Sequence, residues 1–270
     1  MICLELCAGC ARLSKTLRAR GFSTIAVDHS KNRPGVLHPT ISVDLASEES
    51  VQKILALSDE PGVVFYVHAA PPFGTSARSN HRRSRKAIQR LGVLSVKALR
   101  SKRHPNGVPG LDDISKKRIC TANNIYKHIS LILEKLGARC IFTLENPKRS
   151  HMWNTAFVKK LISDFSLIPV DFQQCMWGGE CDKWTRFYCN HDAFCALART
   201  CNGQHSHSSK GVPNQDVLQS GAYTSPLCDK LADIVESIAV QAGVIMLPPK
   251  TTQGKPTPNT FRAAEAGRQP

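Results

Sequence analysis

The sequence predicts a single α/β domain with a mostly parallel β-sheet and helices on both of its faces. In the first half of the chain, short apolar runs alternate with amphipathic stretches, which is the pattern of successive strand–helix units. Two of the apolar runs, 24–27 and 63–67, have the Val and Ile content of buried strands. A chain of 270 residues is long enough for one such domain with a sizeable core.

Apolar runs and end signals place the elements along the chain. Strands are expected at 1–6, 24–27, 41–43, 63–67, 138–144, 167–175 and 184–189. Helices are expected at 13–20, 47–57, 119–136, 152–165 and 225–242. Gly21 is a favourable residue to end the first helix, and Ser47 can cap the second, with Glu48 and Glu49 in its first turn.

The domain is expected to span residues 1–246, followed by a Pro-, Thr- and Gly-rich disordered tail at 247–270. Within it, a basic segment at 78–103 and a Cys/His-rich insert at 189–220 stand apart in composition. No stretch is long and apolar enough to cross a membrane, and the chain opens on a strand pattern instead of a signal peptide. The sequence leaves open whether residues precede Met1 in the natural chain.

The charge of the chain predicts a polyanionic partner. The formal net charge is +15, and residues 78–103 contain no acid. We expect phosphate contacts to DNA, with RNA as an alternative, from five residues of that segment: Arg78, Arg82, Arg83, Arg85 and Lys86. A solvated helix face or a nuclear import signal would account for the same run. No protein partner can be inferred from the sequence.

Eleven cysteines, an odd number without compact pairing, favour free thiols in a reducing compartment. An intracellular protein is therefore predicted, with a nuclear location as an alternative. A subset in and before the insert has the residue types of a zinc site: Cys189, Cys195, Cys201, His205 and His207. Because no close CxxC pair is present, buried thiols and exposed histidines are the competing interpretation.

A small-residue turn follows the first predicted strand and opens a helix. Glycine at position 9 lets backbone N–H groups approach a ligand closely. Asp28 ends the second strand, about twenty residues later, where an acid can accept hydrogen bonds from ribose hydroxyls. Asp44 follows the third strand, near the expected position of an adenine amino group. The combination favours an adenosine-containing cofactor, and an ordinary strand–helix turn is the alternative.

The segment from Glu5 to Ser14 resembles the opening motif of cytosine-5 DNA methyltransferases, acid-L-F-A-G-x-G-G-hydrophobe-S. Cys7, Ala11 and Arg12 depart from that motif. The resemblance implies a Rossmann-like, S-adenosylmethionine-dependent methyltransferase fold. It also implies that the cofactor is held by residues of the first motif, the next two strand ends and the catalytic loop. These are Glu5, Leu6, Ala8, Gly9, Asp28, Asp44 and Pro71.

The segment after the fourth strand, His68–Arg78, resembles the catalytic loop of that family, and most closely a related group that reads P-P-C-G-T. The cytosine reaction needs a thiolate that adds to carbon 6 and activates carbon 5. Here Phe73 follows Pro72 in place of the cysteine. The resemblance further implies that Glu145 holds the target base and that Arg186, in Lys183–Arg186, belongs to a basic strand motif. Residues 222–228 resemble the closing motif of the related group.

Three functions remain open from the sequence. The first is a cofactor-binding protein of the cytosine-5 type whose chemistry is lost or altered at Phe73. The second is a methyltransferase that acts on exocyclic amino groups such as that of adenine, with Pro71, Pro72 and Phe73 as a base-stacking loop, although Ala70 lacks a polar acceptor. The third is a basic nucleic-acid-binding module from a mobile element without catalysis.

Overall fold

A computed structural model describes residues 1–30, 35–56, 64–77, 98–137, 139–207 and 222–243. It contains a seven-stranded sheet in the order β3-β2-β1-β4-β5-β7-β6. The strands are β1 (Ile2–Leu6), β2 (Ser23–Asp28), β3 (Thr40–Ser42), β4 (Val64–Ala69), β5 (Ile141–Pro147), β6 (Ile168–Gln173) and β7 (Trp184–Cys189). The first five run parallel, and β7 is antiparallel to both of its neighbours. The predicted α/β, mostly parallel, Rossmann-like fold is confirmed.

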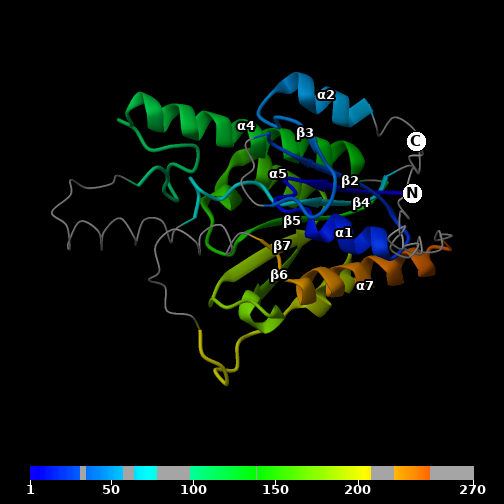
Figure 1. Ribbon diagram of the computed structural model, residues 1–270. Coiled ribbons are helices and arrows are strands. Elements are labelled where there is room, and N and C mark those ends of the chain that lie inside the picture. The colour runs from blue at the N-terminus through cyan, green and yellow to red at the C-terminus, as the bar shows by residue number, and fades with distance from the viewer. Residues whose placement is uncertain (31–34, 57–63, 78–97, 138, 208–221, 244–270) are drawn as a thin grey trace, which may run out of the picture.

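Helices cover both faces of this sheet (Figure 1). On one face, α1 (Arg12–Ala19) packs against α7 (Ser225–Gln241), and their apolar side chains form a core with β6, β7 and part of β4. On the other face lie α2 (Glu48–Ala56), α4 (Asp113–Leu136) and α5 (Ala156–Asp164). Among the described residues, none of these helices combines the length and apolarity needed to cross a bilayer.

The strand order positions a ligand crevice. β1 lies between β2 and β4, so the chain leaves β1 toward one side of the sheet and later returns to its other side. In open α/β sheets, ligands bind outside the carboxyl ends of the strands where the order reverses in this way. The loops after β1 and β4 carry the two motifs singled out in the sequence, and they therefore meet at one edge.

Three short 3₁₀ turns complete the described architecture. They are η1 (His151–Asn154), η2 (Gln174–Trp177) and η3 (Asp192–Leu197). The strand expected at 167–175 ends at Gln173, because the backbone turns there into η2. The helix expected at 152–165 is divided into η1 and α5 by Thr155, whose backbone is extended. The tail expected at 247–270 lies outside the described residues.

Candidate functional site

The loop after β1 has an unusual backbone. Cys7, Gly9 and Ala11 all have φ between 54° and 58°, in the left-handed region. Glycine adopts this region freely, whereas a residue with a Cβ is strained there by about 1–2 kcal/mol. The loop is pinned to the end of β2, since Ala8 N donates to Val27 O at 3.0 Å and Gly9 N to an Asp28 carboxylate oxygen at 2.6 Å. Strain of this kind is concentrated at ligand sites.

Asp28 is the last residue of β2, and Asp44 lies two residues after the end of β3. Asp28 accepts hydrogen bonds from the backbone N–H groups of Gly9 and His29, so its carboxylate stabilises the backbone conformation of the loop after β1. Asp44 is exposed and accepts from Ala46 N at 2.9 Å, which stabilises the turn before α2. Among the described residues that line the cavity beside this loop, neither aspartate is included.

Glu5 is buried on β1 and faces the start of α1. One of its carboxylate oxygens accepts from Ser14 N at 2.8 Å and from Ser14 Oγ at 2.5 Å. Burial raises the pKa of Glu5 to about 7, since the surrounding protein disfavours the charged form more than these two hydrogen bonds favour it. Glu5 therefore ties the first turn of α1 to the strand and lines the cavity at the same point.

We expect Glu5→Gln to remove part of the pH dependence of stability. Folding raises the pKa of Glu5, so the folded protein keeps a proton that the unfolded chain releases, and stability is lost as pH rises from 4.5 to about 7. Glutamine does not titrate and still offers an oxygen to Ser14 N. Urea unfolding of both proteins across this range should show a difference that changes with pH. A constant difference would contradict the assignment.

The loop after β4 is held by side chains from two other elements. Asn146 Nδ2 donates to Pro71 O at 2.9 Å, and the Tyr126 hydroxyl donates to Pro72 O at 2.7 Å. Ser76 N donates to Phe73 O at 3.0 Å and closes the turn. The loop is therefore fixed by α4 and β5, and its two proline carbonyls already accept hydrogen bonds from the protein.

Glu145 lies near the carboxyl end of β5, is 4% exposed, and has one carboxylate oxygen, Oε1, without a hydrogen-bond partner among the described residues. Burial raises its pKa, and the nearby Lys183 opposes that shift. The pKa of Lys183 is lowered by burial. Its ammonium nitrogen lies 5.0 Å from the centre of the Phe73 ring. A carboxyl group, an ammonium group and an aromatic ring thus converge.

These loops enclose one cavity of about 270 Å³ at the carboxyl ends of β1, β4 and β5. Its wall contains Glu5, residues 7–10, residues 70–74, Glu145 and residues 222–223, with Arg12 and Leu13 beside them. The structure thus brings together the predicted residues Glu5, Ala8, Gly9, Pro71, Pro72, Phe73 and Glu145. Leu6, the last residue of β1, is fully buried in the hydrophobic core.

Tyr223 closes the cavity through a buried chain of hydrogen bonds that the sequence did not reveal. Its hydroxyl lies 2.9 Å from His68 Nε2, and His68 Nδ1 lies 2.7 Å from Thr143 Oγ1. Burial lowers the pKa of His68 to about 3, so its ring is neutral at ordinary pH. His68 therefore positions the Tyr223 ring on the cavity wall. Only the polar type of His68 inside an apolar strand could have indicated this role.

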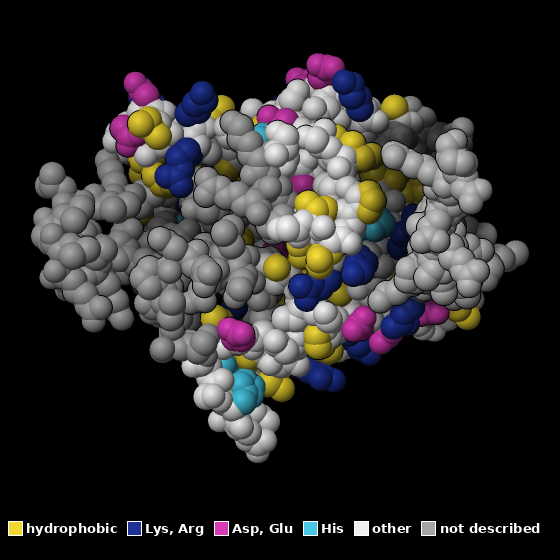
Figure 2. All heavy atoms as spheres, in the orientation of Figure 1, with side chains coloured by type: hydrophobic (Ala, Val, Ile, Leu, Met, Phe, Trp, Pro, Cys, Tyr) yellow, Lys and Arg dark blue, Asp and Glu magenta, His cyan; other side chains and the backbone are white. Residues whose placement is uncertain are grey.

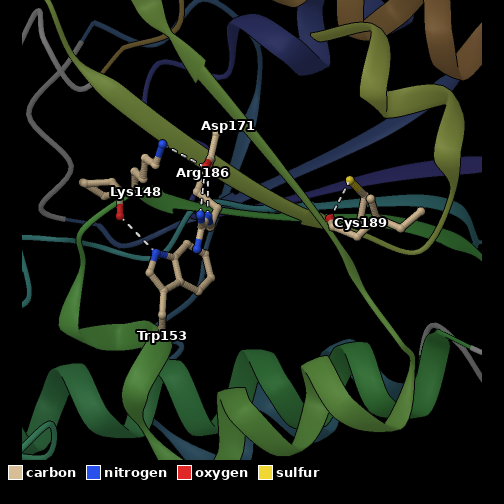
Figure 3. A network of polar contacts seen from close by, with 7 residues as sticks. Lys148, Trp153, Asp171, Arg186 and Cys189 are labelled. Carbon is tan, nitrogen blue, oxygen red and sulfur yellow. Dashed lines mark hydrogen bonds and ion pairs between the residues drawn. The ribbon is translucent and has the colours of Figure 1, made fainter. Parts of the chain in front are cut away.

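Arg186 is not among the residues that line the cavity. Its side chain supports the sheet through contacts on the neighbouring strand (Figure 3). Its Nε and one terminal nitrogen donate to the two Asp171 carboxylate oxygens at 2.6 and 2.8 Å, and Lys148 Nζ lies 3.1 Å from the same carboxylate. Nearby, Trp153 Nε1 donates to Pro147 O at 3.0 Å. These contacts hold the carboxyl end of β5 against β7 and β6. Arg186 therefore contributes to the cavity indirectly, by positioning β5.

The five residues predicted to contact phosphates, Arg78, Arg82, Arg83, Arg85 and Lys86, lie outside the described residues. The end of the basic segment is described, and there Arg100 is fully buried. Its guanidinium donates to Asn123 Oδ1 at 2.7 Å and to Thr75 Oγ1 at 3.1 and 3.2 Å. Arg100 therefore packs beneath the loop after β4 as a structural residue, which composition alone did not distinguish from its neighbours.

The Cys/His-rich insert forms a cluster that differs from the expected one. Cys201, His205 and His207 lie together, and their fourth member is Cys175 of η2. Cys189 lies outside the cluster, because it is buried in β7 with Sγ 3.5 Å from Ile168 O. Cys195 also lies outside it, exposed on η3. Cys175 carries no local signal of a metal site, because residues 167–175 have the pattern of one continuous strand, whereas the backbone turns into η2 after Gln173.

No protein-family model and no curated protein matches the sequence. Three solved structures that are similar to this chain are described as methyltransferases. An E. coli prophage protein described as a DNA modification methyltransferase has a TM-score of 0.39 and 15% identity, over 70% of this chain and 46% of that one. The Entamoeba histolytica methyltransferase EhMeth has a TM-score of 0.39 and 11% identity, over 78% of this chain and 57% of that one. S. pombe Dnmt2 has a TM-score of 0.37 and 10% identity, over 72% of this chain and 53% of that one.

The chain thus spans about half the length of the solved structures that it matches. At 10–15% identity and with TM-scores below 0.5, these similarities do not indicate what the chain binds or which reaction it performs. What this protein binds and does has to be inferred from its own cavity.

Proposed function

We propose that the cavity binds S-adenosylmethionine together with a nucleic-acid base, as in a DNA methyltransferase of the cytosine-5 type, and that Phe73 removes the cytosine reaction. The single observation that carries the proposal is the convergence of the Gly9 loop, the Pro71–Phe73 loop and buried Glu145 on one cavity at the strand-order reversal. Adjacent parallel strands bring these loops to one edge of the sheet, and this edge, at a reversal of strand order, is where open α/β sheets bind their ligands.

The residues at the first loop fit an adenosine-containing cofactor. A Cβ built on Gly9 would meet no atom of the described residues within 4 Å, so bare backbone faces open space beside the start of α1. Ala8, Leu13 and Pro71 supply apolar wall there. The volume of about 270 Å³ is slightly below the range of about 300–1,000 Å³ for sites of drug-sized ligands, so part of the cofactor would extend beyond the cavity. When bound, S-adenosylmethionine supplies an electrophilic methyl group.

The residues at the second loop fit a base. Glu145 offers Oε1, which has no hydrogen-bond partner within the part of the chain that the structure describes and can hydrogen-bond the polar edge of a base that has left the stack. Because burial raises the pKa of Glu145, the protonated form that could donate to a ring nitrogen is favoured. Phe73 offers a ring for stacking and no nucleophile, so these residues can hold a cytosine without activating its carbon 5.

The positive net charge of the chain supports nucleic acid as the source of that base. The net charge is +15, and Phe73 is followed within a few residues by the basic stretch that begins at Arg78. Phosphate contacts of this type give binding that is largely independent of sequence and weakens steeply with salt. The same stretch would serve DNA or RNA, and a titration of both at two salt concentrations separates these substrates.

Transfer to an exocyclic amino group is the second candidate function, because Phe73 and two prolines line the cavity as a stacking loop would. Two observations weigh against it. Ala70 supplies no polar acceptor, and the carbonyls of Pro71 and Pro72 already accept hydrogen bonds from Asn146 and Tyr126. An amino group would therefore find few free acceptors on this loop.

Transfer of a tritiated methyl group to DNA, followed by nucleoside analysis, tests these functions. We expect no 5-methylcytosine from the natural protein, together with DNA binding that strengthens in the presence of cofactor. Methylated adenine would establish the second candidate instead. DNA binding that ignores the cofactor would favour a non-catalytic basic module, and 5-methylcytosine from the natural protein would contradict the role given to Phe73.

A further inference from the structure

A second site lies away from the cavity, on the loop that projects beyond β6 and β7 at the lower edge of the molecule (Figure 1). Cys175 of η2 and three residues of this loop, Cys201, His205 and His207, place one ligand atom each within 4.8 Å of all the others. Figure 2 shows histidine side chains gathered near the tip of this projection. Two thiols and two imidazoles in one small volume are the donor set that zinc prefers.

The distances inside this cluster resemble the edges of a zinc tetrahedron. With bonds of about 2.3 Å to sulfur and about 2.0–2.1 Å to nitrogen, a tetrahedral site has sulfur–nitrogen edges of about 3.6 Å and a nitrogen–nitrogen edge of about 3.3 Å. Cys201 Sγ lies 3.5 Å from His205 Nε2 and 3.6 Å from His207 Nε2, and the two nitrogens are 3.1 Å apart. A disulfide between the two cysteines would leave the convergence of both rings unexplained.

The surrounding backbone holds these side chains as a built site would. Gly203 N donates to Cys201 Sγ at 3.3 Å, a contact that stabilises a thiolate, and Gly203 adopts φ +74° to allow this turn. Gln173, the last residue of β6, accepts from Cys201 N at 2.7 Å, and its own N–H donates to Arg199 O at 3.0 Å. The ligand loop is therefore anchored to the strand that leads into Cys175.

We propose that Cys175, Cys201, His205 and His207 bind one zinc ion, which fastens the loop at 198–207 to the turn after β6. Four protein ligands leave no open position, so the ion is structural and not catalytic. The same turn reaches the cavity side of the molecule. Its last residue, Trp177, donates from Nε1 to Leu197 O at 3.1 Å, and Trp177 O accepts from the hydroxyl of Thr224, the residue that caps α7 next to Tyr223.

Metal analysis of the full-length protein, purified without chelators, tests the site. We expect about one zinc ion per chain by mass spectrometry of the metal. Cys201→Ser and His207→Ala should each lower the bound zinc at least about tenfold. Cys195→Ser is the matched control, because Cys195 is an exposed cysteine of the same segment outside the cluster, and its zinc content should be unchanged. Equal loss in the control would overturn the ligand assignment.

Cobalt substitution separates the loss of a ligand from the loss of folding. Metal-free natural protein titrated with Co²⁺ should give the visible absorption of tetrahedral cobalt and a thiolate-to-cobalt charge-transfer band. Cys175→Ser should lower that charge-transfer band by about half, because one of two thiolates is removed. Natural protein that carries no zinc and gives no tetrahedral cobalt spectrum would overturn the proposal. That result would leave the cofactor proposal untouched, since the two sites share no ligand.

Discussion

Gly9→Val is expected to weaken binding of S-adenosylmethionine by at least about 100-fold, or about 2.7 kcal/mol. Two effects add. Gly9 has φ +58°, a conformation that a β-branched residue adopts only with strain, so the loop between β1 and α1 would shift. The new side chain would also enter the open space where the cofactor must approach the backbone. Isothermal calorimetry of the variant and the natural protein measures the effect.

Gly243→Val is the matched control for this substitution. Gly243 also has a left-handed backbone, with φ +70°, and no atom of the residues with a described structure lies within 4 Å of a built Cβ. It follows the end of α7 and is not among the residues that line the cavity. We expect it to bind cofactor like the natural protein. Similar binding by the Gly9 and Gly243 variants would show that the loop after β1 does not contact the cofactor.

Phe73→Cys is expected to create a covalent complex with DNA that contains 5-fluorocytosine, where the natural protein forms none. The thiolate at position 73 would add to carbon 6 of the base, and carbon 5 would then take the methyl group of the added cofactor. Because fluorine occupies carbon 5, no proton can be removed there to expel the thiolate. Lys183, whose ammonium lies 5.0 Å from the Phe73 ring, would favour the thiolate form of the new cysteine. Denaturing gel electrophoresis with labelled DNA and added cofactor detects the complex.

Phe73→Ser is the control for this experiment, because a hydroxyl of similar size is a far weaker nucleophile and should give no complex. Glu145→Gln in the Phe73→Cys background should reduce the yield of complex, since Glu145 is the residue proposed to hydrogen-bond the base. If Phe73→Cys retained cofactor and DNA binding but formed no complex, position 73 would not face the base, and the cytosine-5 comparison would fail at this loop.

The order of the first strands and helices could be predicted from the sequence because the signals are local. Buried Val- and Ile-rich runs and the Gly21 end signal placed β1, α1, β2 and β4 within a few residues of their observed bounds. The start of α4 was missed by six residues. Its first turns are exposed and polar, and its cap, Asp112, accepts from Ser115 N beyond a Pro- and Gly-containing turn.

Only the site residues that belong to a recognisable sequence motif could be predicted. The Gly9 loop, the Pro71–Phe73 loop and Glu145 could be placed at strand ends, and the topology brings strand ends together. Lys183 and the Tyr223–His68 pair depend on packing between segments far apart in the chain, for which a single sequence offers no local signal. Cys175 was missed for the same reason, because it joins a cluster about 26 residues further along the chain only after the turn at Gln174.

Calorimetric titration of the natural protein with S-adenosylmethionine tests the central claim most directly. If the strand ends of β1, β4 and β5 form a cofactor site, one molecule should bind per chain, and the heat should disappear in Gly9→Val but persist in Gly243→Val. If the natural protein, shown to be folded, gives no binding heat and no thermal stabilisation at cofactor concentrations up to about 1 mM, the cavity is not a site for this cofactor and the proposed function is contradicted.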